Sequence, residues 1–169
     1  RAHRPRSPAR RSAADRWYVA EAYVTVAGTG VYLYRAVDQQ GQVIDVLVAT
    51  RRDTAAAQTF FAGALRVGPS PIEVTSDRAP VYPRVIDEFV SAARHVTEQY
   101  ANNAIEADYG RLKARLPSMG GLKRLASART ISSGRAFVQN VRRGQNEHTA
   151  DDAVHDRVRV AFDELAPSL

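Results

Sequence analysis

The sequence predicts an α/β domain with a mixed five-stranded sheet flanked by helices. Three runs rich in Tyr and Val, over residues 17–26, 31–37 and 43–49, are separated by short turns that contain Gly. Such a pattern is typical of an antiparallel meander. Strand-like and helical segments then alternate as far as residue 116. Because a strand–helix–strand crossover requires parallel pairing, the sheet is expected to be mixed.

The alternating part is expected to begin with a helix over residues 54–65, for which Asp53 is a suitable N-cap. Gly and Pro residues at 68–71 end that helix, and a short buried strand over residues 72–75 follows. The remaining elements are expected in this order: a helix over 82–93, a strand over 95–100, a helix over 102–116, a helix over 126–143 and an amphipathic piece over 154–165. This order matches the ribonuclease-H-like fold. A Rossmann half would need a Gly-rich phosphate loop, which the sequence lacks.

Length and composition exclude several classes of protein. The chain has 169 residues, 44% of them hydrophobic, which is enough to bury a core. It has no cysteine, and no apolar run reaches the roughly 18 residues that cross a membrane. We therefore expect a soluble intracellular protein without a membrane partner. The sequence begins with Arg1, so an upstream piece is expected to be missing.

Positive charge is concentrated in two stretches. Residues 1–12 contain five Arg and no acid, and residues 111–143 contain nine Lys and Arg and no acid. Blocks of this kind attract polyanions, because contacts from Lys and Arg to phosphates dominate non-specific binding to nucleic acid. A solvated helix surface is the alternative interpretation. The length of the acid-free stretch favours nucleic acid.

Two carboxylates are candidates for a catalytic site. Asp77 follows a short buried strand, where open α/β sheets place their ligand crevice, although it could instead cap the next helix. Glu106 lies on the helix over 102–116, on a polar face beside the apolar stripe, although it could be an ordinary surface residue. Carboxylates that lie close together need a cation, and Mg²⁺ or Mn²⁺ suits such ligands. Two such ions about 4 Å apart can support phosphoryl transfer.

Several segments resemble the bacterial insertion-sequence transposases of the IS-six family. They are Arg16 to Val24, Leu33 to Asp38, Arg52-Asp53, Thr75 to Pro80 with Tyr82, and Asn102 to Lys113. The resemblance covers residues 15–147. It leaves residues 1–14 as a basic linker or arm and residues 148–169 as a C-terminal helical tail.

The resemblance implies an integrase-like catalytic core with an Asp-Asp-Glu triad and a two-metal site for Mg²⁺ or Mn²⁺. It implies cleavage and joining of DNA at insertion-sequence ends by a homo-oligomer in the bacterial cytoplasm, associated with the nucleoid. An N-terminal helix-turn-helix region normally precedes such a core. By motif, Asp77 is the second acid and Glu106 the third, and both are expected to bind metal. Arg111, Lys113 and Arg115 are expected to contact DNA phosphates.

The sequence departs from the family where the first acid should stand, because position 20 is Ala20. The neighbouring Glu21 should face the opposite side of the strand, and Asp38 could help only if its strand end reaches the crevice. Near the third acid, this sequence has Tyr109 where the family usually has a His. We therefore expect an impaired metal site and reduced or lost activity. The alternative function is a non-catalytic DNA-binding or assembly module on the same fold, using the basic block at residues 111–143.

Overall fold

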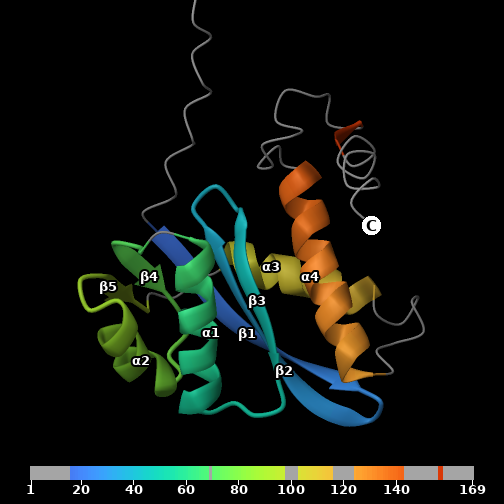
Figure 1. Ribbon diagram of the computed structural model, residues 1–169, viewed down its shortest axis with the longest axis horizontal. Helices are drawn as coiled ribbons and strands as arrows, with labels where there is room; N and C mark the ends of the chain where they lie inside the picture. Colours follow the sequence, from blue (N-terminus) through green and yellow to red (C-terminus); the bar gives the residue numbers. More distant parts are fainter. Residues whose placement is uncertain (1–15, 69, 98–102, 116–123, 143–155, 158–169) are drawn as a thin grey trace, which may run out of the picture.

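Five strands form one mixed sheet in the order β3-β2-β1-β4-β5 (Figure 1). The computed structural model describes residues 16–68, 70–97, 103–115, 124–142 and 156–157. The elements are β1 (Arg16–Val26), β2 (Thr29–Asp38), β3 (Val43–Ala49), α1 (Thr54–Val67), β4 (Glu73–Thr75), α2 (Val81–Phe89), β5 (Arg94–Val96), α3 (Asn103–Arg115) and α4 (Leu125–Arg142). None of the described helices is long and apolar enough to cross a membrane.

The predicted mixed sheet is confirmed. Strands β1, β2 and β3 pair antiparallel as a meander, whereas β4 pairs parallel with β1 and β5 pairs parallel with β4. The parallel pair places Trp17 beside Val74 and Tyr18 beside Thr75, so the end of β4 lies near the first half of β1. This arrangement brings the Ser76-Asp77 segment close to the strand on which the family motif expects its first acid.

Helix α1 forms as predicted, and α2 is shorter than predicted. The Asp53 side chain accepts a hydrogen bond from the Ala56 amide, which caps α1 as the sequence indicated. The prediction of a helix to residue 93 was wrong, because α2 ends at Phe89. The chain turns there, and the Arg94 amide donates to the Ile72 carbonyl, which starts β5 on the sheet. The helical piece predicted over 154–165 lies almost entirely outside the described residues.

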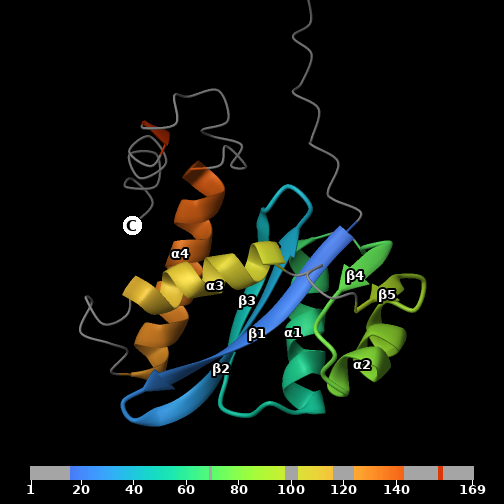
Figure 2. The same ribbon diagram turned by 180° about the vertical axis from the view of Figure 1, so that it is seen from behind.

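The sheet separates two hydrophobic cores. Helices α1 and α2 cover one face and α3 and α4 cover the other, as Figures 1 and 2 show from opposite sides. Side chains of β1 alternate between these cores, so that Trp17 and Val19 pack towards α1 and α2, while Ala20 and Ala22 pack towards α3 and α4. Adjacent residues of β1 therefore take part in different environments.

Helix α4 covers the edge of the sheet at β3. The Asn140 side chain accepts a hydrogen bond from the Val43 amide at 2.7 Å and donates one to the Val43 carbonyl at 2.9 Å. The Gln139 side chain accepts a hydrogen bond from Arg35 of β2. Satisfied backbone groups on an edge strand are protected from pairing with another chain. These contacts tie α4 to β2 and β3.

Candidate active site

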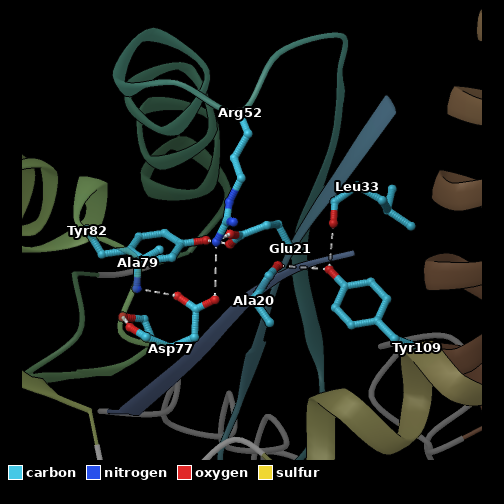
Figure 3. A network of polar contacts seen from close by, with 9 residues as sticks. Ala20, Glu21, Leu33, Arg52, Asp77, Ala79, Tyr82 and Tyr109 are labelled. Atoms are coloured by element: carbon cyan, nitrogen blue, oxygen red, sulfur yellow. Dashed lines mark hydrogen bonds and ion pairs between the residues drawn. The ribbon is translucent and has the colours of Figure 1, made fainter. Parts of the chain in front are cut away.

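Asp77 lies in the segment that follows β4, as the sequence predicted. Its Oδ1 accepts a hydrogen bond from the Ala79 amide at 2.9 Å, and its Oδ2 lies 3.5 Å from Nη2 of Arg52 (Figure 3). The side chain is 43% exposed. Asp77 does not cap the next helix, because the N-cap of α2 is Pro80. Its carboxylate instead closes a local turn and faces Arg52, which stands just before α1.

The residue before Asp77 anchors this segment to β5. Ser76 is buried, its amide donates to the Val96 carbonyl, and its Oγ lies 2.7 Å from Nε2 of His95. The Ser76 hydroxyl also donates to the Asp77 carbonyl. Burial lowers the pKa of His95 below its ordinary value, which favours the neutral imidazole. The backbone just before Asp77 is therefore held to β5.

Position 20 faces the helix that carries Glu106. Ala20 is buried in the same cluster as Ile105 and Tyr109 of α3. The Tyr109 hydroxyl lies 2.8 Å from the Ala20 carbonyl and 2.9 Å from the Leu33 carbonyl, and it donates to this pair (Figure 3). Tyr109 thus attaches α3 to the backbone of β1 and β2 at position 20.

Glu106 is exposed on α3, while Ile105 and Tyr109 of the same helix face the core. Within the described part of the chain, no three acidic or histidine side chains lie close enough together to hold a metal ion. Lys113 is exposed on α3, whereas the side chains of Arg111 and Arg115 lie outside those described. The structure places Asp77 at the strand end and Glu106 on α3 without joining them in a group of three ligands.

The acid of β1 that shares a partner with Asp77 is Glu21. Its side chain is 4% exposed, Oε1 forms an ion pair with Nη2 of Arg52, and Oε2 accepts a hydrogen bond from the Tyr82 hydroxyl. The prediction that residues 20 and 21 face opposite sides is confirmed. Figure 3 shows Arg52 between Glu21 and Asp77, with Ala20 turned towards Tyr109.

Sequence reasoning missed the contacts of Glu21, Arg52 and Tyr82. Arg52 and Tyr82 stand in segments that resemble the family, but no spacing rule assigns them to Glu21. Asp38 stands at the end of β2. Its Oδ1 accepts hydrogen bonds from the Gln40 and Gln42 amides and holds the turn between β2 and β3.

Electrostatics keep this cluster in a defined protonation state. Burial, and next the charge of Glu21, raise the pKa of Tyr82 far above its ordinary value, so its hydroxyl remains a neutral donor. Partial burial lowers the pKa of Arg52, but Glu21 and Asp77 outweigh this and raise it. Arg52 is therefore a permanent cation beside two carboxylates.

The chain matches the family described as a DDE domain over residues 14–145. It belongs to the DDE transposases of the IS-six family. A transposase for the insertion sequence-like element IS431mec of Staphylococcus aureus is 30% identical over 105 residues, which are 59% of this chain and 47% of that protein. The chain thus spans about half the length of the curated relatives it matches.

Solved structures with the same fold are retroviral integrase cores. The catalytic core of BIV integrase gives a TM-score of 0.56 at 13% identity and covers 92% of this chain and 99% of that one. The HTLV-2 integrase catalytic core, solved in complex with magnesium in a dimeric form, gives 0.52 at 18% identity, covering 62% of this chain and 70% of that one. These similarities establish the ribonuclease-H-like fold.

The described residues do not fit the two-metal centre that the family implies. Ala20 offers no side-chain ligand, and its carbonyl already accepts a hydrogen bond from Tyr109. One oxygen of Asp77 faces the guanidinium of Arg52 and the other faces an amide. Mg²⁺ is usually bound through one or two protein carboxylates, whose oxygens must be free to turn towards the ion. This arrangement stabilises the carboxylates with protein donors.

Proposed function

We propose that this chain is the core domain of an insertion-sequence transposase whose metal-dependent cleavage and joining of DNA is impaired at position 20. Family membership supports action on DNA, because the relatives are transposases. The proposed domain covers residues 15–147, with a basic arm before it and a helical tail after it. Asp77 and Glu106 are the second and third acids in this proposal.

The observation that carries the proposal is the place of Ala20. It lies within β1, faces the helix that bears Glu106, and belongs to the strand beside which β4 runs parallel towards Asp77. A carboxylate at position 20 would therefore point into the space between the sheet and α3. Loss of one ligand of a metal centre removes charge stabilisation of the reacting phosphate.

The sheet offers a suitable neighbour for an acid at this position. Arg35 lies directly opposite Ala20 in the β1–β2 pairing and is buried on the same face. Cross-strand neighbours of opposite charge stabilise each other, and a nearby guanidinium favours the ionised carboxylate. The Ala20→Asp variant is therefore expected to fold, even though the surrounding cluster is apolar.

The test compares Ala20→Asp with the natural chain and with Ala22→Asp, which places an acid on the same face two residues further along β1. We expect Ala20→Asp to bind Mn²⁺ in a calorimetric titration and to nick supercoiled plasmid with Mg²⁺, at least roughly tenfold faster than either comparison protein. Plasmid nicking needs no knowledge of the terminal repeats. Metal binding by Ala20→Asp without any gain of nicking would contradict the proposed role of position 20.

The same proposal specifies cofactor, partners and location. Mg²⁺ or Mn²⁺ is the proposed cofactor, and DNA at insertion-sequence ends and at the target is the proposed substrate. We propose that the protein acts as a homo-oligomer in the bacterial cytoplasm, associated with the nucleoid. A cross-linking experiment with and without DNA tests the oligomer.

A second candidate function is a non-catalytic DNA-binding or assembly module on the same fold. Exposed basic residues on the α3 and α4 side favour it, namely Lys113, Arg124, Arg129 and Arg142. Contacts of this kind to phosphates give affinity that falls steeply with salt and needs no divalent ion. Such binding would persist whether or not position 20 carries an acid.

A pair of charge variants tests this second function. Arg129→Ala on α4 is compared with Arg84→Ala, which removes an exposed arginine from α2 on the other side of the sheet. We expect only Arg129→Ala to weaken binding to duplex DNA, and to lower the salt dependence by about one phosphate contact. Binding that requires Mn²⁺ and disappears in Asp77→Ala would argue against a metal-independent module.

A further inference from the structure

The Arg52 guanidinium joins two carboxylates that come from different strands. Its Nη2 forms an ion pair with Oε1 of Glu21 and lies 3.5 Å from Oδ2 of Asp77. Glu21 comes from the middle of β1 and Asp77 from the segment after β4. In Figure 3 the guanidinium points into the space between these two side chains.

Each carboxylate is shared in the same way between Arg52 and a neutral donor. The second oxygen of Glu21 accepts from the Tyr82 hydroxyl, and the second oxygen of Asp77 accepts from the Ala79 amide at 2.9 Å. Arg52 immediately precedes Asp53, whose side chain caps α1, so its backbone is fixed at the start of that helix. The cation is therefore held by the fold where the two acids converge.

We propose that Arg52 positions Asp77 and competes with divalent metal ions for its carboxylate. A guanidinium and a metal ion both require the negative charge of Oδ2, and the two cations repel each other at short range. Glu21 holds Arg52 in place because a nearly buried carboxylate needs a charged partner. This inference rests on the proposed function, since the ion excluded is the one that Asp77 would bind there.

A charge-matched variant separates competition from net charge. Replacing Glu21 and Arg52 together, as Glu21→Gln with Arg52→Gln, removes one negative and one positive charge. The formal charge around Asp77 stays the same, and Gln at both positions keeps hydrogen-bonding groups near Tyr82. The variant differs from the natural chain chiefly in whether a cation lies beside Asp77.

The measurement is paramagnetic broadening of backbone amide signals by Mn²⁺ in the full chain. The Ala79 amide reports an ion at Asp77, because its nitrogen lies 2.9 Å from Oδ1. The Gln40 amide, 2.9 Å from Oδ1 of Asp38, is the matched control for Mn²⁺ at another aspartate. We expect the Ala79 signal of the natural chain to need roughly tenfold more Mn²⁺ for half-broadening than that of the double variant.

Broadening at the same Mn²⁺ concentration in both proteins would overturn the proposal, and so would the lack of Ala79 broadening in the double variant. Plasmid nicking by Ala20→Asp is measured separately, so failure of the proposed function is distinguishable from failure of this inference.

A second measurement compares the natural chain with single variants and does not depend on the double variant folding. Rotation of the Arg52 guanidinium is followed by NMR of its side-chain nitrogens. We expect Asp77→Asn to speed this rotation by about twofold or more, because a charge-assisted contact is lost. Glu73→Gln, which removes the carboxylate paired with Arg94 at 3.3 Å, should leave the Arg52 signals unchanged. Equal effects of the two substitutions, or none from Asp77→Asn, would contradict the bridge.

Discussion

The two sides of strand β1 differ in what they bury and in how their polar groups are satisfied. On the α1 and α2 side the largest buried side chains are aromatic, and the strand also carries Glu21, paired with Arg52 and Tyr82. On the α3 and α4 side the strand contributes only uncharged residues to the core, namely Ala20, Ala22, Val24 and Val26, with Tyr18 partly buried against them. There the hydroxyl of Tyr109 donates hydrogen bonds to backbone carbonyls and not to a charged side chain.

This difference shows how one strand can serve two environments one residue apart. Alternation sends Glu21 into a cluster that supplies a guanidinium and a hydroxyl, whereas Ala20 faces apolar side chains and α3. A buried carboxylate is stable only where such donors exist. The charged network of this chain lies on the α1 side of β1, while position 20, where the first acid is proposed to belong, lies on the other side.

The largest expected effect comes from disrupting the charged contacts on the α1 and α2 side of β1. The Glu21 carboxylate is 4% exposed and contacts Arg52 and the Tyr82 hydroxyl. Arg52→Gln removes the charged partner and keeps the hydroxyl. We expect a loss of about 2 kcal/mol in the free energy of unfolding, less than the roughly 3–5 kcal/mol of a fully buried pair because Arg52 is 44% exposed. Urea unfolding at neutral pH measures it.

The Glu21→Gln with Arg52→Gln variant is the control for this loss. It removes the unpaired charge, so it should retain more stability than Arg52→Gln alone, by about 1 kcal/mol. A double variant that is less stable than the single one would show that the buried carboxylate is not the cause.

A smaller effect is expected on the other side of the strand. Tyr109→Phe removes the hydroxyl that donates to the Ala20 and Leu33 carbonyls, and we expect a loss of about 1 kcal/mol in the free energy of unfolding. Tyr23→Phe is the control, because Tyr23 is 56% exposed and its ring packs edge-on against Tyr32. If thermal unfolding is the same for both variants, the hydroxyl does not attach α3 to the sheet.

The smallest effect concerns pH and the edge strand β3. Burial raises the pKa of Asp45 above its ordinary value of 3.8, although the Val46 amide and then Arg66 oppose this. The folded state therefore holds the proton more tightly than the unfolded state does. This contribution to stability is complete below pH 3.8 and is lost as the pH rises through the folded-state pKa.

Asp45→Asn should remove this pH dependence and raise the free energy of unfolding at pH 7 by about 0.5 kcal/mol. Urea midpoints between acidic and neutral pH measure the effect, with Asp87→Asn on the exposed side of α2 as the control for net charge. The Asp45 carboxylate lies against α1, since a Cβ on Gly63 would be 2.7 Å from its Oδ2 and would force that side chain to shift. A lower midpoint for Asp45→Asn at pH 7 would contradict the assigned cause.

Much of the fold followed from local patterns in the sequence. Alternating Tyr and Val residues predicted β1 and β2, and Asp53 predicted the start of α1, because strand faces and helix caps depend on residues close in the chain. The end of α2 was predicted wrongly. A pairing between Arg94 and Ile72 starts β5 there, and helical periodicity alone does not show that contact.

The sequence by itself determined the family, the order of the elements and the alanine at position 20. It also determined that residues 20 and 21 face opposite sides, since side chains alternate along a strand. Only the tertiary structure decided that Glu21 and Asp77 share Arg52, which is 25 residues from Asp77 in the chain. Local rules do not predict such a contact, because it depends on how β1, β4 and the start of α1 pack together.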